Sequence, residues 1–549
     1  MKKTAKVIYL ILLLGFTVVY LFWRIGWTLP KGHGALDMFF ALILLFTELM
    51  GVAEMIIHYG LEAGRRDCPP LPKSGKETLW PEVDVLVTTF GEPADLLERT
   101  LKACLDMEYE GRVRVCLCDD SGREELKALS ETLGVKYLTR SDRRDAKAGN
   151  LNEALKHTDS PLVAVFDADM CPDRHFLKET VPYFLAGKDR HGKQLVSAKT
   201  GLVQTPQDFR NEDLFQRAFR AGECIPNEQD FFYLELEPAR NTCNAVIFGG
   251  SNALISRKAL KEAGGFVTGT LTEDFATGIE IQKKGFRCIA LDRPLSSGLA
   301  PESLAALISQ RTRWARGCIQ AGIRTRLLTS KGLNAAQRLS YLAAVTYWYA
   351  PLKRAVYLLA PLMFSVFGIT VMNCDFKQML MFWLPMYLLS TLGIRLFSGG
   401  IRSAKWSEIY ELCLFPFLLP GVLAETVGIR KKDFKVTDKS GSQGWHFWYL
   451  LPFAALTGLS VLGIVNTVGR MIDEQTTIYL FLLFWLVFNL YELLYAFLFV
   501  LSCRRLPAQK ERKIRIHRLA KGQLWRTGLL WIILRIFFTT MQKRISDSI

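Results

Sequence analysis

Long apolar runs lie at both ends of the chain and leave a more polar block between them. They occupy residues 7–23, 35–57, 355–372, 379–397, 445–468 and 477–501. Most come close to the ~20 apolar residues that a helix needs to cross a bilayer. No small-residue cleavage site follows the first run, and the second run comes soon after it. The pattern therefore predicts a retained transmembrane hairpin over residues 1–65 rather than a cleaved signal peptide.

A seventh apolar run, at residues 407–429, contains three glutamates and two prolines. Basic residues cluster after it, around Lys431, and after the last long run, from Arg504. If this run crossed the membrane, the two basic clusters would face opposite sides, against the positive-inside rule. We therefore expect an interfacial helix at 407–429 and six transmembrane helices in all.

The block over residues 66–331 alternates strand-like and helix-like patterns. Three short β-branched, apolar runs are typical of buried parallel strands, and helical patterns separate them. The strands are expected at 83–88, 113–118 and 162–166, and the helices include 94–105 and 150–156. The alternation predicts one α/β domain of about 260 residues, at the upper end of the usual size range.

Composition agrees with a membrane protein. Half of the residues are hydrophobic and 12% are aromatic. The net charge of +16 favours an anionic membrane face over nucleic acid, because the basic clusters adjoin apolar runs and no recognition motif accompanies them. The 12 cysteines form no CxxC pair, so reduced thiols are expected. The basic tail, 503–549, ends in a short apolar run that predicts an amphipathic helix lying on the membrane.

Carboxylates follow each of the three predicted strands. Glu92 follows the first strand, Asp119 and Asp120 the second, and Asp167 and Asp169 the third. Because the carboxyl ends of parallel strands meet at one edge of a sheet, we expect these groups to share a cleft. A single D-x-D is more often a capped loop than a metal site. Because other acids are expected at the same edge, Asp167 and Asp169 are expected to hold Mg²⁺ or Mn²⁺. The cation would in turn bind a diphosphate.

The other acids at this edge also have a purely structural interpretation. Asp119 and Asp120 begin an Asp-Asp-Ser-Gly sequence that is typical of turns, and Glu92 could be an acid at a helix N-terminus. At successive strand ends, the three could jointly contact a nucleobase and its ribose. Lys147 lies just before a predicted helix start, where a lysine and free backbone amides both suit phosphate.

The triplet Thr272-Glu273-Asp274 could be a helix start, with its threonine as the N-cap. Alternatively, Asp274 could be a general base that takes a proton from an acceptor hydroxyl.

Further along, Gln310, Arg313 and Trp314 are spaced to share one face of a helix. That face would offer an amide, a guanidinium for a phosphate and an indole for stacking on a sugar ring.

In this order, the motifs resemble those of bacterial cellulose synthase catalytic subunits, which are processive family-2 glycosyltransferases with a GT-A fold. The resemblance covers about residues 84–441. Its most specific parts are 146–152, 272–274, 310–314 and the sequence Phe434-Lys435-Val436-Thr437-Asp438-Lys439, similar to the family's F-x-V-T-x-K gating loop. It implies a GT-A domain inserted in a helical membrane domain, with a channel region over 332–502 and a gating loop at 430–442.

The resemblance also implies a role for each matched residue. The uridine side would be held by Asp120 with Asp119 and Glu92, and the metal and diphosphate by Asp167 and Asp169. Asp274 would be the catalytic base, with Glu273 and Thr272 beside it. The diphosphate and the acceptor end of the glucan would contact Gln310, Arg313 and Trp314, and the gate would consist of Phe434, Val436 and Thr437.

The implied reaction is an inverting single displacement on UDP-glucose that extends a β-1,4-glucan at its non-reducing end. The expected partners are UDP-glucose, the growing glucan and the lipid bilayer, with no nucleic acid. The need for accessory synthase subunits stays open. The expected location is the plasma (inner) membrane, crossed several times, with the catalytic domain in the cytosol.

Three features depart from the family pattern. The family often has Tyr-Asn-Glu where Phe90-Gly91-Glu92 stands. Its Phe-Cys-Gly-Ser stretch is replaced by Phe248-Gly249-Gly250-Ser251, so contacts with the acceptor are expected to differ. Only 47 residues follow Ser502, too few for the PilZ domain that binds cyclic di-GMP in many bacterial members, so we expect no complete PilZ domain.

Two alternatives remain at this point. Another β-glycan could be the product: a β-1,3- or mixed-linkage glucan, hyaluronan or poly-N-acetylglucosamine. Amino-sugar polymerases tend to carry Gly-Asp-Asp where this chain has Thr272-Glu273-Asp274, which favours a glucose polymer. A non-catalytic export subunit is the second alternative, although it would not need to retain every acidic motif.

Overall fold

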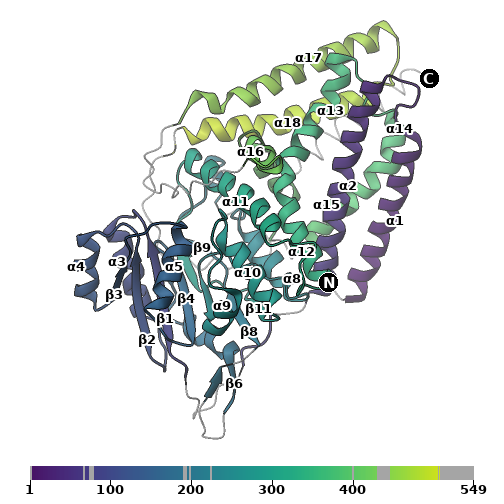
Figure 1. Ribbon diagram of the computed structural model, residues 1–549. Coiled ribbons are helices and arrows are strands. Elements are labelled where there is room, and N and C mark those ends of the chain that lie inside the picture. The colour runs from purple at the N-terminus through teal and green to yellow at the C-terminus, as the bar shows by residue number, and fades with distance from the viewer. Residues whose placement is uncertain are drawn as a thin grey trace.

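The computed structural model describes residues 3–65, 68–72, 80–188, 194–196, 199–222, 225–398, 401–429, 445–504 and 506. It contains an α/β domain and a set of long helices that pack against each other (Figure 1). The α/β domain lies between the second and the later long helices in chain order, as the hydrophobic pattern predicts.

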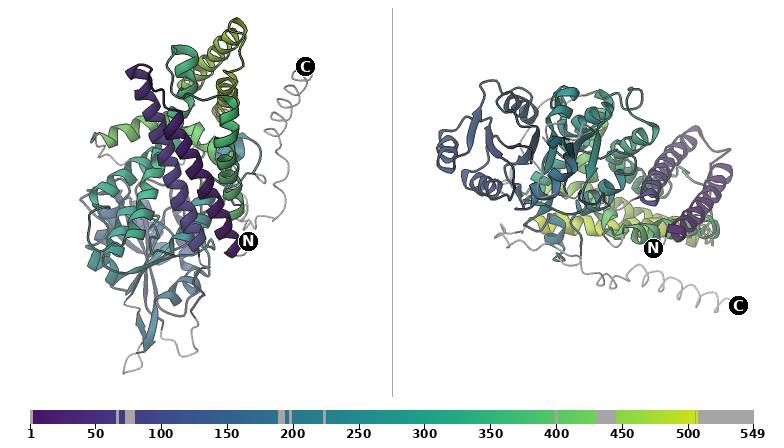
Figure 2. Two further views of the ribbon diagram at one scale, coloured as in Figure 1. Left: turned by 90° about the vertical axis from the view of Figure 1, so that its right-hand side faces the viewer. Right: turned by 90° about the horizontal axis from the view of Figure 1, so that it is seen from below.

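The first two helices form the expected hairpin, α1 (Lys3–Trp27) and α2 (Ala35–Gly64). They run side by side, and the N-terminus lies at the end of the hairpin nearer the α/β domain (Figures 1 and 2). The buried Arg24 joins the two helices, since its Nε donates to Glu48 Oε2 at 2.7 Å. A charge inside an apolar hairpin requires such a partner.

The central sheet has seven strands in the order β11-β8-β10-β4-β1-β2-β3. Their bounds are β1 (Val83–Thr89), β2 (Val113–Asp119), β3 (Lys136–Thr139), β4 (Leu162–Asp167), β8 (Thr200–Gln204), β10 (Ala253–Ser256) and β11 (Arg287–Ala290). The three predicted strands are present and lie side by side in parallel, β4-β1-β2. β10 runs antiparallel to β4 and β8, which makes the sheet mixed.

Two smaller sheets complete the strands. One contains β5 (Cys171–Pro172), β9 (Asp208–Phe209) and β12 (Ser296–Gly298), and the other pairs β6 (Leu185–Lys188) with β7 (Gln194–Val196). β12 pairs with the segment that follows β4, so it ties Asp169 and its neighbours to the second half of the domain.

Helices cover both faces of the central sheet. The helices of the domain are α3 (Ala94–Leu105), α4 (Glu124–Leu133), α5 (Ala146–Lys156), α6 (Phe176–Thr180), η1 (Val181–Phe184), α7 (Leu214–Ala218), η2 (Phe231–Leu236), α8 (Glu237–Arg240), α9 (Arg257–Ala263) and α10 (Glu273–Lys283). Val85 of β1 packs on the face covered by α3, and Leu86 on the face covered by α5. This is the two-residue period of a strand buried on both sides. Cys116 and Cys118 are fully buried on the Leu86 face.

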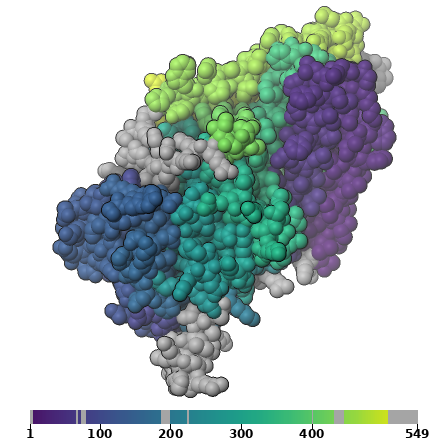
Figure 3. All heavy atoms as spheres, viewed as in Figure 1, coloured from purple at the N-terminus to yellow at the C-terminus, as the bar shows by residue number. Residues whose placement is uncertain are grey.

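The second helical part begins at the end of the domain. Its elements are α11 (Leu304–Arg324), α12 (Ala335–Thr346), η3 (Tyr347–Tyr349), α13 (Ala350–Phe367), α14 (Phe376–Gln378), η4 (Met379–Trp383), α15 (Leu384–Phe397), α16 (Ala404–Thr426), η5 (Phe447–Tyr449), α17 (Leu451–Asp473) and α18 (Leu480–Cys503). The space-filling view shows α1 and α2, in purple, lying directly against the green helices of this part (Figure 3).

The expected span at 355–372 is wrong at its C-terminal boundary. α13 ends at Phe367 because Gly368 adopts a left-handed conformation with φ of 72°. Its amide donates to Phe364 O at 3.0 Å, and the next amide, of Ile369, donates to Met363 O at 2.9 Å. This pair of bonds closes a helix at glycine, so the apolar residues that follow form a loop instead.

Seven stretches of the described residues are long and apolar enough to cross a membrane, one more than expected. They are Thr4–Trp27, Ala35–Gly64, Ala335–Phe367, Phe376–Phe397, Ala404–Thr426, Phe447–Asp473 and Leu480–Cys503. The additional stretch is α16, which we expected in the interface. Figure 1 shows α16 nearly end on, whereas α1, α2 and α13 lie lengthwise, so α16 crosses them. Its place in the interface stays a prediction.

Candidate active site

The three parallel strands deliver their acids to one edge of the sheet, as predicted. Thr88 pairs with Asp167 across β1 and β4, and Thr89 with Asp119 across β1 and β2. The amide of Asp120 then donates to Thr89 O at 3.0 Å, so the turns after β1 and β2 lie against each other.

Two of these acids shape their own loops. Glu92 Oε2 accepts hydrogen bonds from Thr89 Oγ1 at 2.7 Å and from the amide of Phe90 at 2.9 Å. Asp119 accepts from the amides of Ser121 and Arg123 at 2.9 and 2.8 Å. Burial would raise the pKa of Asp119, but its hydrogen bonds hold that pKa below the ordinary value. Both carboxylates therefore make rigid turns at the edge of the sheet.

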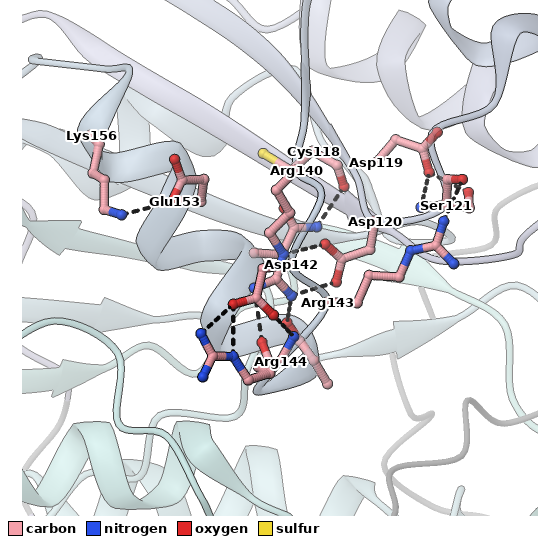
Figure 4. A network of polar contacts seen from close by, with 12 residues as sticks. Cys118, Asp119, Asp120, Ser121, Arg140, Asp142, Arg143, Arg144, Glu153 and Lys156 are labelled. Carbon is pink, nitrogen blue, oxygen red and sulfur yellow. Dashed lines mark hydrogen bonds and ion pairs between the residues drawn. The ribbon is translucent and has the colours of Figure 1, made fainter.

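Asp120 forms a two-pronged ion pair with Arg140. The Nε and Nη2 atoms of Arg140 lie 2.6 and 2.8 Å from the two carboxylate oxygens, and both side chains are largely buried. Arg140 also donates to the carbonyl oxygens of Arg144 and Ala146, each at 2.8 Å (Figure 4). A side chain at Gly149 would collide with this guanidinium, so glycine is required there. The pair thus fixes the 140–146 loop.

That loop ends in a strained turn directly before Lys147. Asp145 and Ala146 adopt positive φ values of 61° and 41°, which residues with a Cβ rarely do. α5 starts at Ala146, so Lys147 lies inside its first turn. The sequence pattern had predicted a position just before the helix, so this boundary was wrong. Asn150 anchors the same helix to the sheet, because its Nδ2 donates to Cys118 O at 2.8 Å. Such strain persists only where the surroundings enforce it.

Lys147 links the strand-end acids to the triplet at 272–274. Its ammonium forms an ion pair with Asp167 and donates to Gly250 O at 2.7 Å. Burial would lower the pKa of Lys147, but the charges of Asp167 and Glu273 raise it above the ordinary value. Gly250, with φ of 82°, lies so close to the Asp274 carboxylate that a Cβ would meet its Oδ2 at 2.5 Å. Residues 147, 167, 250 and 274 therefore form one cluster.

The triplet begins a helix, but its threonine does not cap it. Thr272 precedes α10 without a side-chain capping bond, and its hydroxyl finds no hydrogen-bond partner within the described part of the chain. Burial and the charge of Asp274 raise the pKa of Glu273 to about 7. Burial also raises the pKa of Asp274, although the Phe275 amide, at 2.7 Å, and the charge of Lys147 oppose it. Glu273 and Asp274 thus form a partly buried pair of carboxyl groups, which favours the functional interpretation of the triplet.

Helix α11 brings the second motif to the triplet. Gln310, Arg313 and Trp314 lie on this helix, as predicted. Gly317 lets the helix pack against Thr272, whose backbone amide lies 2.8 Å from the position of a Cβ at 317. The charge of Arg313 acts on both carboxyls of the triplet. The buried Oε1 atom of Gln310 accepts no hydrogen bond from any residue that the structure describes, so it is open to a ligand.

The two aspartates expected to hold a metal differ in surroundings. The side chain of Asp167 is 40% exposed, whereas Asp169 is buried and its Oδ2 accepts from the Leu299 amide at 3.1 Å. In the described ranges, no group of three or more His, Cys, Asp and Glu side chains could hold a metal ion. With only these two carboxylates, a cation would have to take its other ligands from a diphosphate and water, as Mg²⁺ commonly does.

A cavity of about 1470 Å³ adjoins the triplet and extends into the long helices. Asp274 and Trp314 line it at the α/β domain, and His33 and Asn373 line it among the loops at the far ends of the helices. Between them, the wall contains many aromatic side chains and several charged groups, among them Trp383, Trp406, Trp485, Arg354, Glu408, Glu411 and Glu492. Aromatic rings with interspersed polar groups suit a carbohydrate.

Sequence analysis missed two contributors, Arg140 and Tyr233, and did not predict which side chain Gly250 approaches. Arg140 belongs to a basic run, and nothing in its spacing indicates its partner. Gly250 and Tyr233 meet the site only in three dimensions: the Tyr233 hydroxyl lies 2.8 Å from the position of a Cβ at Gly249. Gly249, which stands where the family has cysteine, therefore leaves room for the Tyr233 side chain. The expected gate residues Phe434, Val436 and Thr437 lie outside the described residues.

The fold and site define a family-2 glycosyltransferase with the GT-A architecture. The model of the glycosyltransferase-like family 2 matches residues 81–317, which contain the sheet, the strand-end acids and the triplet. The model of the cellulose synthase family matches residues 256–546, more than half of the chain. The chain belongs to the cellulose synthase family.

Curated relatives carry the same family name. The cellulose synthase catalytic subunit (UDP-forming) of Pseudomonas fluorescens is 34% identical over 86% of this chain and 63% of its own length. The corresponding subunit of Xanthomonas axonopodis pv. citri is 33% identical over 86% and 64%. Cellulose synthase 2 of Novacetimonas hansenii is 33% identical over 83% of this chain and 28% of its own length. The chain thus spans less than two thirds of each of these relatives.

Among solved structures, a mannosyltransferase from Pyrobaculum calidifontis in complex with GDP-mannose and Mn²⁺ aligns with a TM-score of 0.49 and 18% identity. The alignment covers 71% of this chain and all of the mannosyltransferase.

Proposed function

We propose that this protein transfers glucose from UDP-glucose to the non-reducing end of a β-1,4-glucan, processively and with inversion, and passes the polymer across a membrane. The observation that carries the proposal is the continuity of one cavity from the Asp274 carboxylate to the far ends of the long helices. A polymerase that exports its product needs such a path, whereas a transferase with a small soluble product does not.

The donor would bind at the edge of the sheet. Lys147 and Arg313 supply the positive charge that a diphosphate requires beside Glu273 and Asp274. Asp120, Asp119 and Glu92 form the turns against which the uridine would lie, and Asp120 is held by Arg140. A divalent cation held by Asp167 and Asp169, Mg²⁺ or Mn²⁺, would neutralise the departing diphosphate.

The acceptor would enter from the cavity side. Asp274 would take the proton from the acceptor hydroxyl as that oxygen attacks the anomeric carbon of the donor. Burial raises the pKa of this carboxyl, which makes it a stronger base than a solvated aspartate. Trp314 would stack on the terminal sugar, and the Gln310 amide oxygen, which accepts no hydrogen bond from the described residues, would be available to the ligand. The single displacement on one face of the sugar inverts its configuration.

The polymer would leave among the long helices. Arg354 lies 3.4 Å from Glu411 and 3.8 Å from Glu492, so these three charged groups of the cavity wall are paired with one another. Charges within a helical membrane region are commonly placed toward a polar path. Hydroxyl groups of a glucan would find hydrogen-bond partners there and aromatic rings to slide over. The membrane would be the plasma membrane, with the α/β domain in the cytosol; accessory subunits stay open.

The test is synthesis by the purified protein in proteoliposomes from radiolabelled UDP-glucose with Mg²⁺ or Mn²⁺. The expected product is a labelled polymer that a β-1,4-specific endoglucanase degrades. A polymer that resists this enzyme would show that the linkage is not β-1,4, and β-1,3 would be the first alternative. If only UDP-N-acetylglucosamine or UDP-glucuronate yields polymer, glucose is the wrong sugar. If every donor fails but UDP-glucose binds, a non-catalytic export role replaces the proposal.

A further inference from the structure

Arg311 lies directly beside Trp314 but has no part in the reaction described so far. The two residues are three apart on α11, and the guanidinium carbon of Arg311 lies 4.1 Å from the centre of the indole. Arg311 is only 6% exposed and Trp314 is half-buried, and both side chains line the cavity. The guanidinium thus rests on the ring as a cation–π pair.

The other edge of Arg311 is anchored by a carboxylate. Its Nη2 forms an ion pair with Glu228, whose side chain is 11% exposed. Glu228 comes from the loop before η2, and this loop is itself held: the Glu228 amide donates to Asp213 Oδ2 at 3.0 Å. Asp213 also caps α7, and Tyr410 of α16 donates to Pro226 O at 3.0 Å. The anchor is therefore a fixed point rather than a mobile surface acid.

A planar guanidinium can stack on an indole and bind a carboxylate at the same time. It stacks its face on an aromatic ring while its N–H edge binds a carboxylate, whereas a lysine ammonium cannot cover a ring in the same way. A cation against a desolvated indole holds the ring more firmly than the same pair in water. With one face occupied by Arg311, the orientation of the indole is set, and its remaining surface is offered to the cavity.

We propose that Arg311, anchored by Glu228, is a positioning residue that fixes the Trp314 indole as the platform for the terminal sugar of the acceptor. The inference deepens the proposed function and rests on it for the identity of that sugar. It assigns Arg311 a role through Trp314, without contact with the donor.

A purely structural ion pair between the loop at 225–230 and α11 would have different consequences. It would need only the charge of Arg311, so lysine would replace arginine without effect. The platform needs the stacked plane as well, so lysine would fail. The two roles therefore separate on one conservative substitution.

The experiment uses the full chain in detergent and measures the affinity for cellotetraose and for UDP, with thermal unfolding as the check on folding. The variants are Arg311→Lys, Glu228→Gln and Trp314→Ala, and the control is Arg324→Met at the exposed end of the same helix. We expect Arg311→Lys and Glu228→Gln to bind cellotetraose about tenfold more weakly, approaching Trp314→Ala, with the UDP affinity and the control unchanged.

The outcomes are distinct. Cellotetraose affinity unchanged in Arg311→Lys would overturn the inference, as would equal losses for cellotetraose and UDP, or the absence of cellotetraose binding by the unaltered protein. If Arg311→Lys does not fold, Glu228→Gln, which keeps the arginine, decides by the same criterion. If the unaltered protein binds cellotetraose but polymerises no sugar, the proposed function fails while the same affinities still decide the role of Arg311.

Discussion

The ammonium group of Lys147 donates a hydrogen bond of 2.7 Å to the carbonyl oxygen of Gly250. Lys147 belongs to the first turn of α5, and Gly250 lies beside the carboxylate of Asp274. This single bond therefore joins the half of the site made from strand ends to the half that carries the expected base. A lysine placed there can bind a diphosphate and organise the acceptor side at the same time.

Removal of the expected base should stop turnover without weakening the binding of the donor nucleotide. In Asp274→Asn, the amide cannot accept the proton, so we expect the rate of glucose transfer to fall by about 100-fold or more, while the affinity for UDP stays close to normal. Radiolabel incorporation and UDP titration measure the two. The matched control is Asp106→Asn, at an exposed position after α3. Appreciable synthesis by Asp274→Asn would exclude this base.

Loss of the Lys147 ammonium should affect the donor first. Lys147→Met keeps the length of the side chain but leaves Asp167 without its cationic partner and the diphosphate without a ligand. We expect the affinity for UDP-glucose to fall about tenfold, as for the loss of a charge-assisted hydrogen bond. Lys156→Met, at the exposed end of the same helix, should bind normally. Equal affinities in the two variants would count against a phosphate role for Lys147.

The Asp120–Arg140 pair should be sensitive even to a conservative change. Arg140→Lys keeps the charge but loses the two-pronged contact and the bonds to the 144 and 146 carbonyls. We expect a loss of about 1–3 kcal/mol in stability and weaker binding of UDP-glucose, because the strained turn before Lys147 is no longer held.

Thermal unfolding and UDP-glucose titration check this expectation for Arg140. The control is Arg144→Lys, since the Arg144 side chain is 86% exposed. If Arg140→Lys is as stable as the control and binds UDP-glucose as tightly, the 140–146 loop does not depend on the Asp120–Arg140 pair.

Glu273 should make stability depend on pH. Its pKa in the folded protein, about 7, lies above the ordinary value of 4.5, so folding favours the protonated form. The stabilisation is fully present below about pH 4.5 and is lost as the pH rises through 7. Glu273→Gln, which cannot ionise, should therefore match the unaltered protein at pH 5 and unfold at a higher temperature than it at pH 8, by about 2 °C. A difference that is the same at both pH values would contradict the shift.

Local sequence patterns were enough to predict individual helices and strands and the order of the functional residues along the chain. The β-branched runs predicted β1, β2 and β4, because strands buried on both faces are rich in apolar residues on each face. The spacing of Gln310, Arg313 and Trp314 predicted one helical face, since the helical period sets which residues are neighbours. The apolar runs predicted the long helices and the separate α/β domain between them.

Tertiary structure alone decided which of these groups meet. The pairing of Asp120 with Arg140, the approach of Gly250 to Asp274 and the antiparallel course of β10 join residues far apart in the chain, so no local pattern encodes them. The end of α13 is different, because Gly368 is a local helix-stop signal that the prediction from the apolar run overlooked. The cavity that links Asp274 to the far helix ends exists only once the domain and the helices pack together.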